Sequence, residues 1–204
     1  MNDTELLIFL LGGILLFAAV IWFGLRSGQR FQERMSEISI DDVRLKHPTL
    51  GGANFLFAYE NDFSLKEVGY IAKDSKTNEV YKTVYLGGLK GAVAKIIIGE
   101  KEYECVAVSD FFRRRRALKE KMSDKVICES IRGFKNTSYK ISGGDSYIKK
   151  MKFPPTKYSI INERNDQVSM EKFPLDSSLT SEYGRVVVYY DDLPMQVRLF
   201  MMMP

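Results

Sequence analysis

Apolar and polar positions divide the chain into three parts. The first part holds an unbroken apolar run from Leu6 to Leu25 with no charged side chain. At about 1.5 Å of rise per residue, a helix over this run is about 30 Å long, which matches the hydrocarbon core of a bilayer. Trp22 lies near the end of the run, where an amphipathic ring suits the headgroup level. The pattern predicts a transmembrane anchor within residues 1–26.

The flanks of the apolar run predict how it is used. A secretory signal peptide needs a basic start and a cleavage site of small residues after a short apolar stretch. The residues before Leu6 are acidic instead, and Ala18-Ala19 lies inside the run. The run is therefore predicted to be a retained single-pass signal-anchor. The basic residues nearest to it all follow it, and they are Arg26, Arg30 and Arg34. The positive-inside rule then places the N-terminus outside and residues 27–204 in the cytoplasm.

Residues 27–52 form the second part. Their apolar side chains recur at loosely helical spacing among charges, and the segment ends at Pro48 and Gly51-Gly52. This texture predicts a juxtamembrane helix or an ordered linker. A helix that continues directly from the membrane span gives the same pattern.

Residues 53–204 form the third part, in which short runs rich in Val, Ile, Tyr and Phe recur about every ten residues between turn residues. The predicted strands are Asn54–Tyr59, Val68–Lys73, Val80–Leu86, Ala92–Ile98, Tyr103–Val108, Val126–Ile131, Ser138–Ile141, Tyr147–Met151, Tyr158–Asn162, Val168–Lys172 and Gly184–Tyr190. Strands that follow one another without amphipathic helices between them predict a mainly β domain. Its architecture is expected to be an antiparallel sandwich or a closed β-barrel.

Two segments depart from the strand pattern. Asp110–Met122 combines good helix formers with Ser109 or Asp110 as an N-cap, which predicts a helix. The strongly apolar segment after Asp191-Asp192 begins with Leu193-Pro194, and acidic residues before a proline suit a helix start. This last segment is expected to be a short helix buried in the domain, or the beginning of a segment that continues past Pro204.

Several of these pieces together resemble the tubby C-terminal-like superfamily, which includes the phospholipid scramblases. The resemblance starts near Val84 and is carried by GAVAKIIIGEKEYECVAV, KISGGDSYIKKM, TKYSIINERNDQVSMEKF and VVVYYDDLPMQVRLFMMM. It implies about a dozen antiparallel strands around a central hydrophobic helix, here Met195–Met203. It also implies a lipid-facing or ligand-binding module rather than an enzyme. The anchor often follows the barrel in that family, whereas here it precedes it. The family's phosphoinositide-binding residues have no clear match, so none is assigned.

The densest charge in the chain follows a pair of phenylalanines. The candidate lipid-binding or partner-binding residues are Phe111, Phe112, Arg113, Arg114, Arg115, Arg116, Lys119 and Lys121. Near an anionic leaflet each cation contributes about 1 kcal/mol of attraction. A solvated helix face balanced by nearby acids explains the same charges. Residues 27–204 hold 29 basic and 24 acidic side chains, a net charge of only +5, which disfavours nucleic acid as the partner.

The remaining residue types predict no catalytic residue, no metal site and no cofactor. His47 is the only histidine, and it lies in the linker without a partner motif for a catalytic triad or a zinc site. The glycine-rich stretch 87–91 lacks the ending of a phosphate-binding loop, so a turn is expected there. Cys105 and Cys128 lie in alternating apolar patterns and are expected to be buried thiols, in keeping with a reducing compartment.

These expectations combine into a membrane-anchored, non-catalytic binding module. Its β-rich domain would contact anionic lipid headgroups or a membrane protein partner. The alternative is a structural or accessory subunit of a larger membrane complex, in which the span packs on other helices. A third arrangement places the domain outside the cytoplasm, behind an uncleaved signal-anchor.

Overall fold

The computed structural model describes residues 3–61, 68–86, 91–110, 113–133, 135–152, 157–172, 184–190 and 193–203. Within these ranges the structure does not describe the side chains of residues 3–9, 25, 28, 31 and 32 of α1, nor those of several residues at strand ends. The helices are α1 (Asp3–Glu37), α2 (Ile40–Lys46), the 3-10 helix η1 (Pro48–Leu50) and α3 (Met195–Met202). The strands are β1 (Asn54–Asn61), β2 (Val68–Asp74), β3 (Val80–Tyr85), β4 (Gly91–Ile98), β5 (Lys101–Asp110), β6 (Arg113–Glu120), β7 (Val126–Arg132), β8 (Asn136–Ile141), β9 (Ser146–Lys152), β10 (Lys157–Asn162), β11 (Gln167–Lys172) and β12 (Gly184–Tyr189).

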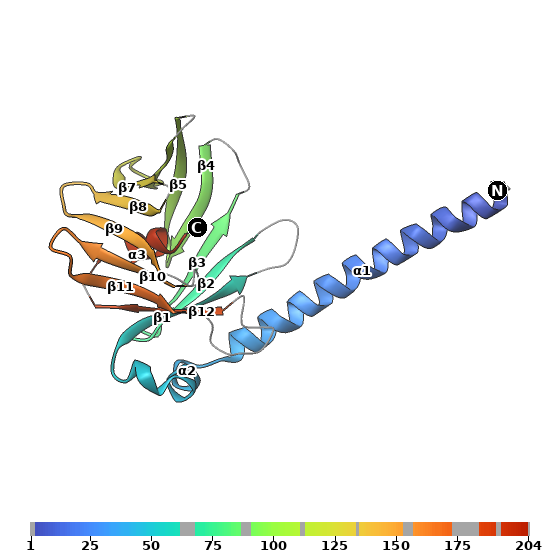
Figure 1. Cartoon of the computed structure of the whole chain (residues 1–204), viewed down its shortest axis with the longest axis horizontal. Coiled ribbons are helices and arrows are strands. Elements are labelled where there is room, and N and C mark those ends of the chain that lie inside the picture. The colour runs from blue at the N-terminus through green and yellow to red at the C-terminus, as the bar shows by residue number, and fades with distance from the viewer. Residues whose placement is uncertain are drawn as a thin grey trace.

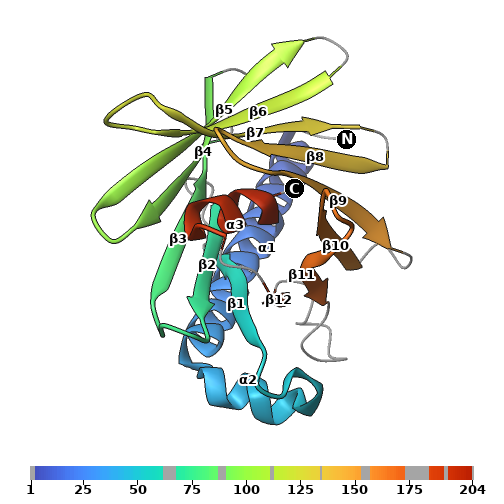
Figure 2. The ribbon, with the colours of Figure 1, turned by 90° about the vertical axis from the view of Figure 1, so that its left-hand side faces the viewer.

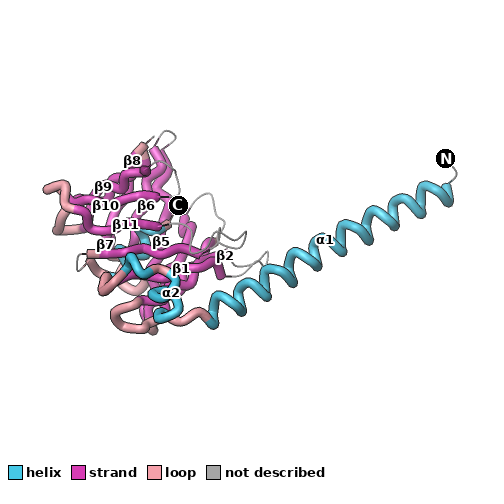
Figure 3. Tube along the Cα trace, turned by 60° about the horizontal axis from the view of Figure 1, so that its bottom comes forward, coloured by secondary structure: helices cyan, strands magenta, loops and turns pink. Residues whose placement is uncertain are grey.

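The strands form one closed antiparallel barrel, in the order β1-β12-β11-β10-β9-β8-β7-β6-β5-β4-β3-β2 (Figures 1 and 3). Each strand pairs with its neighbours in sequence, and the first strand pairs with the last, from Asn54↔Tyr189 to Tyr59↔Gly184. Closure leaves no strand with unpaired backbone groups at an edge. The prediction of a mainly β domain is confirmed, and of the two architectures expected from the sequence the closed barrel is correct.

The short helix α3 fills the middle of the barrel (Figure 2). A barrel of about eight strands is just narrow enough for its own side chains to fill, so a twelve-strand barrel needs additional material inside. Here Val197, Leu199, Phe200, Met201 and Met202 supply it, each at most 4% exposed. They pack against the inward-facing residues of the strands in one core. The predicted buried helix at the C-terminal end of the domain is confirmed.

A second, smaller core lies on the outside of β1 and β12, under the end of α1 and under α2. Phe55, Phe57 and Tyr59 of β1 point outward into it and meet Met35 of α1 and Val43 of α2. Because β1 is covered on both faces, its sequence is continuously apolar rather than alternating. The segment predicted as a juxtamembrane helix or linker is thus the end of α1 followed by a separate helix.

The helix predicted over Asp110–Met122 is wrong, because this segment contains the strand β6. Its backbone pairs with β5 from Tyr103↔Glu120 to Asp110↔Arg113, and with β7 on the other side. Arg, Lys, Glu, Ala and Leu favour helices, but propensity is a weak prior. Hydrogen bonding to two strands and the burial of Ala117 and Leu118 outweigh it here.

Candidate functional site

The helix α1 carries a long apolar surface that the barrel does not cover. Figure 1 shows α1 projecting away from the barrel as a single rod. Its large apolar side chains between Leu10 and Phe23 are 41% to 71% exposed. They are Leu10, Leu11, Ile14, Leu15, Leu16, Phe17, Val20, Ile21, Trp22 and Phe23. Four consecutive positions, 14 to 17, belong to this set, so the apolar surface runs around the whole helix at 100° per residue.

The predicted ends of the membrane span, Leu6 and Leu25, lie within α1, but their side chains are outside the described residues. Across the side chains that the structure does describe, no helix combines the length and the apolar character needed to cross a membrane. Trp22 stacks under the guanidinium of Arg26, which lies 5.0 Å from the centre of its ring. The transmembrane span remains a prediction.

The end of α1 is fastened to the barrel by Lys73 of β2. Its Nζ donates hydrogen bonds to the carbonyl oxygens of Ser36, at 2.6 Å, and Ile38, at 3.0 Å. Carbonyls at a helix C-terminus lack partners within the helix, and a cation there also complements the helix dipole. Partial burial lowers the pKa of Lys73. This contact joins residues far apart in sequence, and it ties the C-terminal end of α1 to the barrel.

The members of the predicted cationic cluster whose side chains the structure describes do not form one patch. Arg115 and Arg116 are neighbours on a strand, so they point to opposite faces of the barrel wall. Arg115 is exposed, whereas the charge of Arg116 acts on the buried Cys105 and Tyr139 inside. Arg113 and Arg114 belong to β6, but the structure does not describe their side chains. Phe111 and Phe112 lie outside the described residues.

The two lysines of the predicted cluster lie toward the opposite end of β6. Lys119 forms an ion pair with Asp124 at 2.9 Å, and Lys121 forms one with Glu102 at 2.7 Å. At about 3.3 Å per residue, the eight steps from Arg113 to Lys121 span about 26 Å, and the five steps from Arg116 to Lys121 span about 17 Å. The helical prediction had placed all these cations on one short element.

Among the described residues, three cations inside the barrel stack on tyrosine rings. Arg185 of β12 lies 4.2 Å from the ring centre of Tyr70, and Arg198 of α3 lies 3.8 Å from that of Tyr189. Tyr189 donates a hydrogen bond of 2.6 Å to the buried carboxylate of Asp74. Burial, with Asp74 nearby, raises the pKa of Tyr189. These pairs let charged groups remain inside a largely apolar core.

The third interior cation, Lys149 of β9, holds the end of α3. Its Nζ lies 3.9 Å from the ring centre of Tyr158 and donates to the carbonyl oxygens of Met201 and Met203 at 3.1 Å and 3.5 Å. Tyr139 also donates to the carbonyl of Met201, at 3.4 Å. Sequence reasoning missed Lys149 and Arg185. For Arg185 the available signal was its position in the otherwise apolar strand β12, whereas Lys149 lies beside two other lysines in β9 and gave no such signal.

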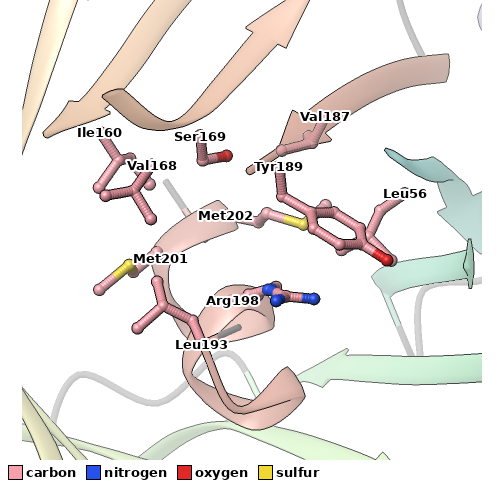
Figure 4. A pocket seen from close by; sticks show the side chains of 10 residues that line it. All are labelled: Leu56, Ile160, Val168, Ser169, Val187, Tyr189, Leu193, Arg198, Met201 and Met202. Carbon is pink, nitrogen blue, oxygen red and sulfur yellow. The ribbon is translucent and has the colours of Figure 1, made fainter. Parts of the chain in front are cut away.

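Two interior pockets that described residues line, both beside α3, are small. Figure 4 shows one pocket between α3 and the wall, lined by residues such as Tyr189, Arg198 and Met202, with a volume of about 10 Å³. A second pocket, beside Tyr70 and Arg185, is of about the same volume. A volume of 10–15 Å³ is roughly what one water needs. In this conformation neither pocket admits a larger ligand.

A larger hollow of about 310 Å³ lies on the outside of β7 and β8, beside Glu129 and Lys140. Its lining mixes both signs of charge, so it selects for neither an anion nor a cation. Within the described residues, no group of three or more His, Cys, Asp or Glu is placed to hold a metal ion.

The two cysteines are both fully buried, at 0% exposure, as the sequence predicted. Burial raises the pKa of Cys105 to about 11 and that of Cys128 to about 12. Both are therefore neutral thiols, shielded from reagents. His47 lies between α2 and η1, where its backbone N–H donates to the carbonyl of Val43 at 3.0 Å. The turn predicted at 87–91 falls mostly outside the described residues, as does Asp191-Asp192.

Comparison with protein-family models, with curated proteins and with solved structures finds no significant match to this chain.

Proposed function

We propose that the chain is a membrane-anchored, non-catalytic binding module. In this proposal α1 crosses the bilayer and the barrel is presented at the membrane surface, where it contacts anionic lipid headgroups or a membrane protein. The proposed span is Leu6–Leu25, and the structure does not describe the side chains of some residues in it. The observation that carries the proposal is the apolar surface around α1, exposed over ten large side chains. An apolar surface of this extent on one element marks a membrane or protein contact.

The charge next to the apolar surface supports an orientation. Arg26, Arg30 and Arg34 follow the proposed span, and no basic residue precedes it. By the positive-inside rule, the N-terminus lies outside and the barrel lies in the cytoplasm. The buried, unpaired thiols of Cys105 and Cys128 are compatible with a reducing compartment.

The resemblance to the tubby C-terminal-like superfamily belongs to this proposal as well. It implied about a dozen antiparallel strands around a hydrophobic helix, and a module that faces lipid or binds a ligand. The barrel with α3 inside it has that arrangement. This likeness supports a binding role over a catalytic one.

Extraction of membranes with alkaline carbonate tests the anchor. We expect the full chain to stay with the membranes, and a Leu15→Arg/Phe17→Arg variant to be released. Each charge at the centre of a span costs about 2.5–3.5 kcal/mol of insertion free energy. A Leu45→Arg/Met122→Arg variant adds the same charge at exposed positions on α2 and in the β6–β7 turn, and serves as the control. Release of the unmodified chain by carbonate would contradict the proposal.

Labelling in intact cells tests the orientation. A membrane-impermeant maleimide should label Asn2→Cys in intact cells, and should label Ser142→Cys only after lysis. The unmodified chain is the control, since both of its thiols are buried. Labelling of Ser142→Cys in intact cells would place the barrel outside.

An accessory subunit of a larger complex would present the same exposed helix to neighbouring transmembrane helices. Purification in mild detergent separates the two roles. A partner retained in fixed stoichiometry would favour the subunit, and a lone chain that floats with liposomes would favour the binding module.

A further inference from the structure

The two ends of the barrel differ in charge, and one of them faces the same way as α1. We define the near end as the last three residues of β1, β3, β5, β7, β9 and β11, the first three of the other strands, and Gly133 and Lys135 between β7 and β8. The far end consists of the short turns 75–79, 99–100, 121–125, 142–145 and 163–166, with Lys101, which directly follows the second of them.

The geometry of α1 places the near end at the level of the proposed membrane surface. The end of α1 is held at Lys73, close to the far end of β2. From this point, α1 extends toward its N-terminus. It runs in the same direction as the near end faces (Figures 1 and 2). The five steps from Lys73 to Val68 at the near end span about 17 Å. The ten steps from Ser36 back to Arg26 span about 15 Å.

The near end carries one sign of charge among the side chains that the structure describes. The charged ones there are Arg115, Arg132, Lys135, Lys150 and Arg185, and all but Arg185 are exposed. The other charged positions of these strand ends, whose side chains are outside the description, are five basic and three acidic: Arg113, Arg114, Lys152, Lys157, Lys172, Glu60, Asp110 and Glu171. The segments that join these strand ends in sequence, 62–67, 87–90 and 173–183, add two basic and four acidic residues. The net charge of this end by sequence is still positive.

The far end has a different character. Its exposed acids include Glu79, Glu100, Asp124 and Glu163, and cations such as Lys101 lie among them. The barrel is therefore polarised along its axis, and the direction of α1 points its basic end toward the bilayer.

We propose that the near end is a membrane-contacting surface that binds anionic headgroups of the same bilayer that α1 crosses. The inference rests on the proposed function, because α1 defines which way the membrane lies. Each cation near an anionic leaflet adds about 1 kcal/mol of attraction, which decays over a Debye length of about 8–10 Å. The near end and the basic residues after the span occupy about the same height, so both act on one leaflet. The contact sets the barrel upright on the membrane.

Fluorescence quenching of the full chain in liposomes tests the orientation. The two ends of β8 offer a matched pair of labelling positions, Asn136→Cys at the near end and Ser142→Cys at the far end. An environment-sensitive fluorophore is attached at either position, and a nitroxide quencher is carried on lipid headgroups. We expect loss of fluorescence at position 136 and none at 142. We also expect the loss to be larger with phosphatidylserine than with phosphatidylcholine alone, and to shrink as salt is added.

Charge removal tests the cause. Arg115→Gln/Arg132→Gln/Lys135→Gln should abolish the phosphatidylserine-dependent part of the quenching at 136. Lys101→Gln/Lys125→Gln/Arg164→Gln removes the same charge from the far end and should leave it unchanged. Equal quenching at both positions, or stronger quenching at 142, overturns the inference when the chain floats with the liposomes. If the chain does not float with the liposomes, that result contradicts the proposed function rather than this inference.

Discussion

In this barrel the fate of a residue depends first on which face of the wall it occupies. Arg115 and Arg116 are adjacent and chemically identical, yet one meets solvent and the other acts on buried groups. The two cysteines lie in a fully buried, apolar part of the inner face. Cys105 and Cys128 lie on either side of Leu118, which pairs with both of them, and all three are 0% exposed.

Burial of the two thiols predicts how stability depends on pH. The pKa of Cys105 is about 11 in the fold, against an ordinary value of 9.0, chiefly because burial disfavours the thiolate. A raised pKa contributes stability that is fully present below pH 9 and is lost as the pH rises through about 11. At about 1.4 kcal/mol per pKa unit, this amounts to on the order of 3 kcal/mol for Cys105.

Urea unfolding in detergent, measured from pH 8 upward, checks this expectation. The free energy of unfolding of the unmodified chain should fall more steeply above pH 9 than that of a Cys105→Ala/Cys128→Ala variant. The variant will be less stable at neutral pH, so the comparison is between the two slopes. Identical slopes would show that the thiols do not cause the loss of stability at alkaline pH.

Among the elements, the fastening of α1 to the barrel matters most to the proposed role. A Lys73→Met change keeps most of the apolar stem but removes both hydrogen bonds to the end of α1. Hydrogen bonds from charged donors contribute about 1.5–3 kcal/mol, and partial exposure places Lys73 at the lower end of that range. We expect faster amide hydrogen exchange at residues 36–42 in the variant. A Lys101→Met change in an exposed turn is the control, and equal exchange in both variants would count against the clamp.

For the whole molecule, the decisive feature is that the barrel encloses a helix. The ring of Phe200 is 2% exposed and packs edge-on against Tyr139, with ring centres 5.9 Å apart. Phe200→Ala should therefore cost about 3–5 kcal/mol of unfolding free energy. Gln196→Ala, on the same helix at a partly exposed position, should change it by no more than about 0.5 kcal/mol. Thermal unfolding in detergent measures both, and similar losses for the two variants would contradict the central role of α3.

The proposed orientation of the barrel on the membrane is also a property of the whole molecule. It depends on the direction of α1 and on the unequal charge of the two barrel ends together. Neither alone selects which surface of the barrel meets lipid. The quenching experiment at the two ends of β8 therefore tests the assembled geometry rather than any single contact.

The local pattern of the sequence was enough to locate most strands. Each predicted strand overlaps an observed one, since half-buried strands alternate apolar and polar residues between recognisable turns. The segment that became β6 failed because its residues favour a helix in isolation, and only its neighbours in the barrel make it a strand. The buried helix α3 was predictable because its residues are almost all apolar.

The sequence by itself determined the mainly β domain, the apolar run at Leu6–Leu25, the buried thiols and the C-terminal helix. Each of these depends on residues adjacent in the chain. Only the tertiary structure decided between sandwich and barrel, separated Arg113–Arg116 from Lys119 and Lys121, and brought Lys73 to the end of α1. These outcomes depend on strand pairing and packing between distant segments, where barrel closure outweighs local preference.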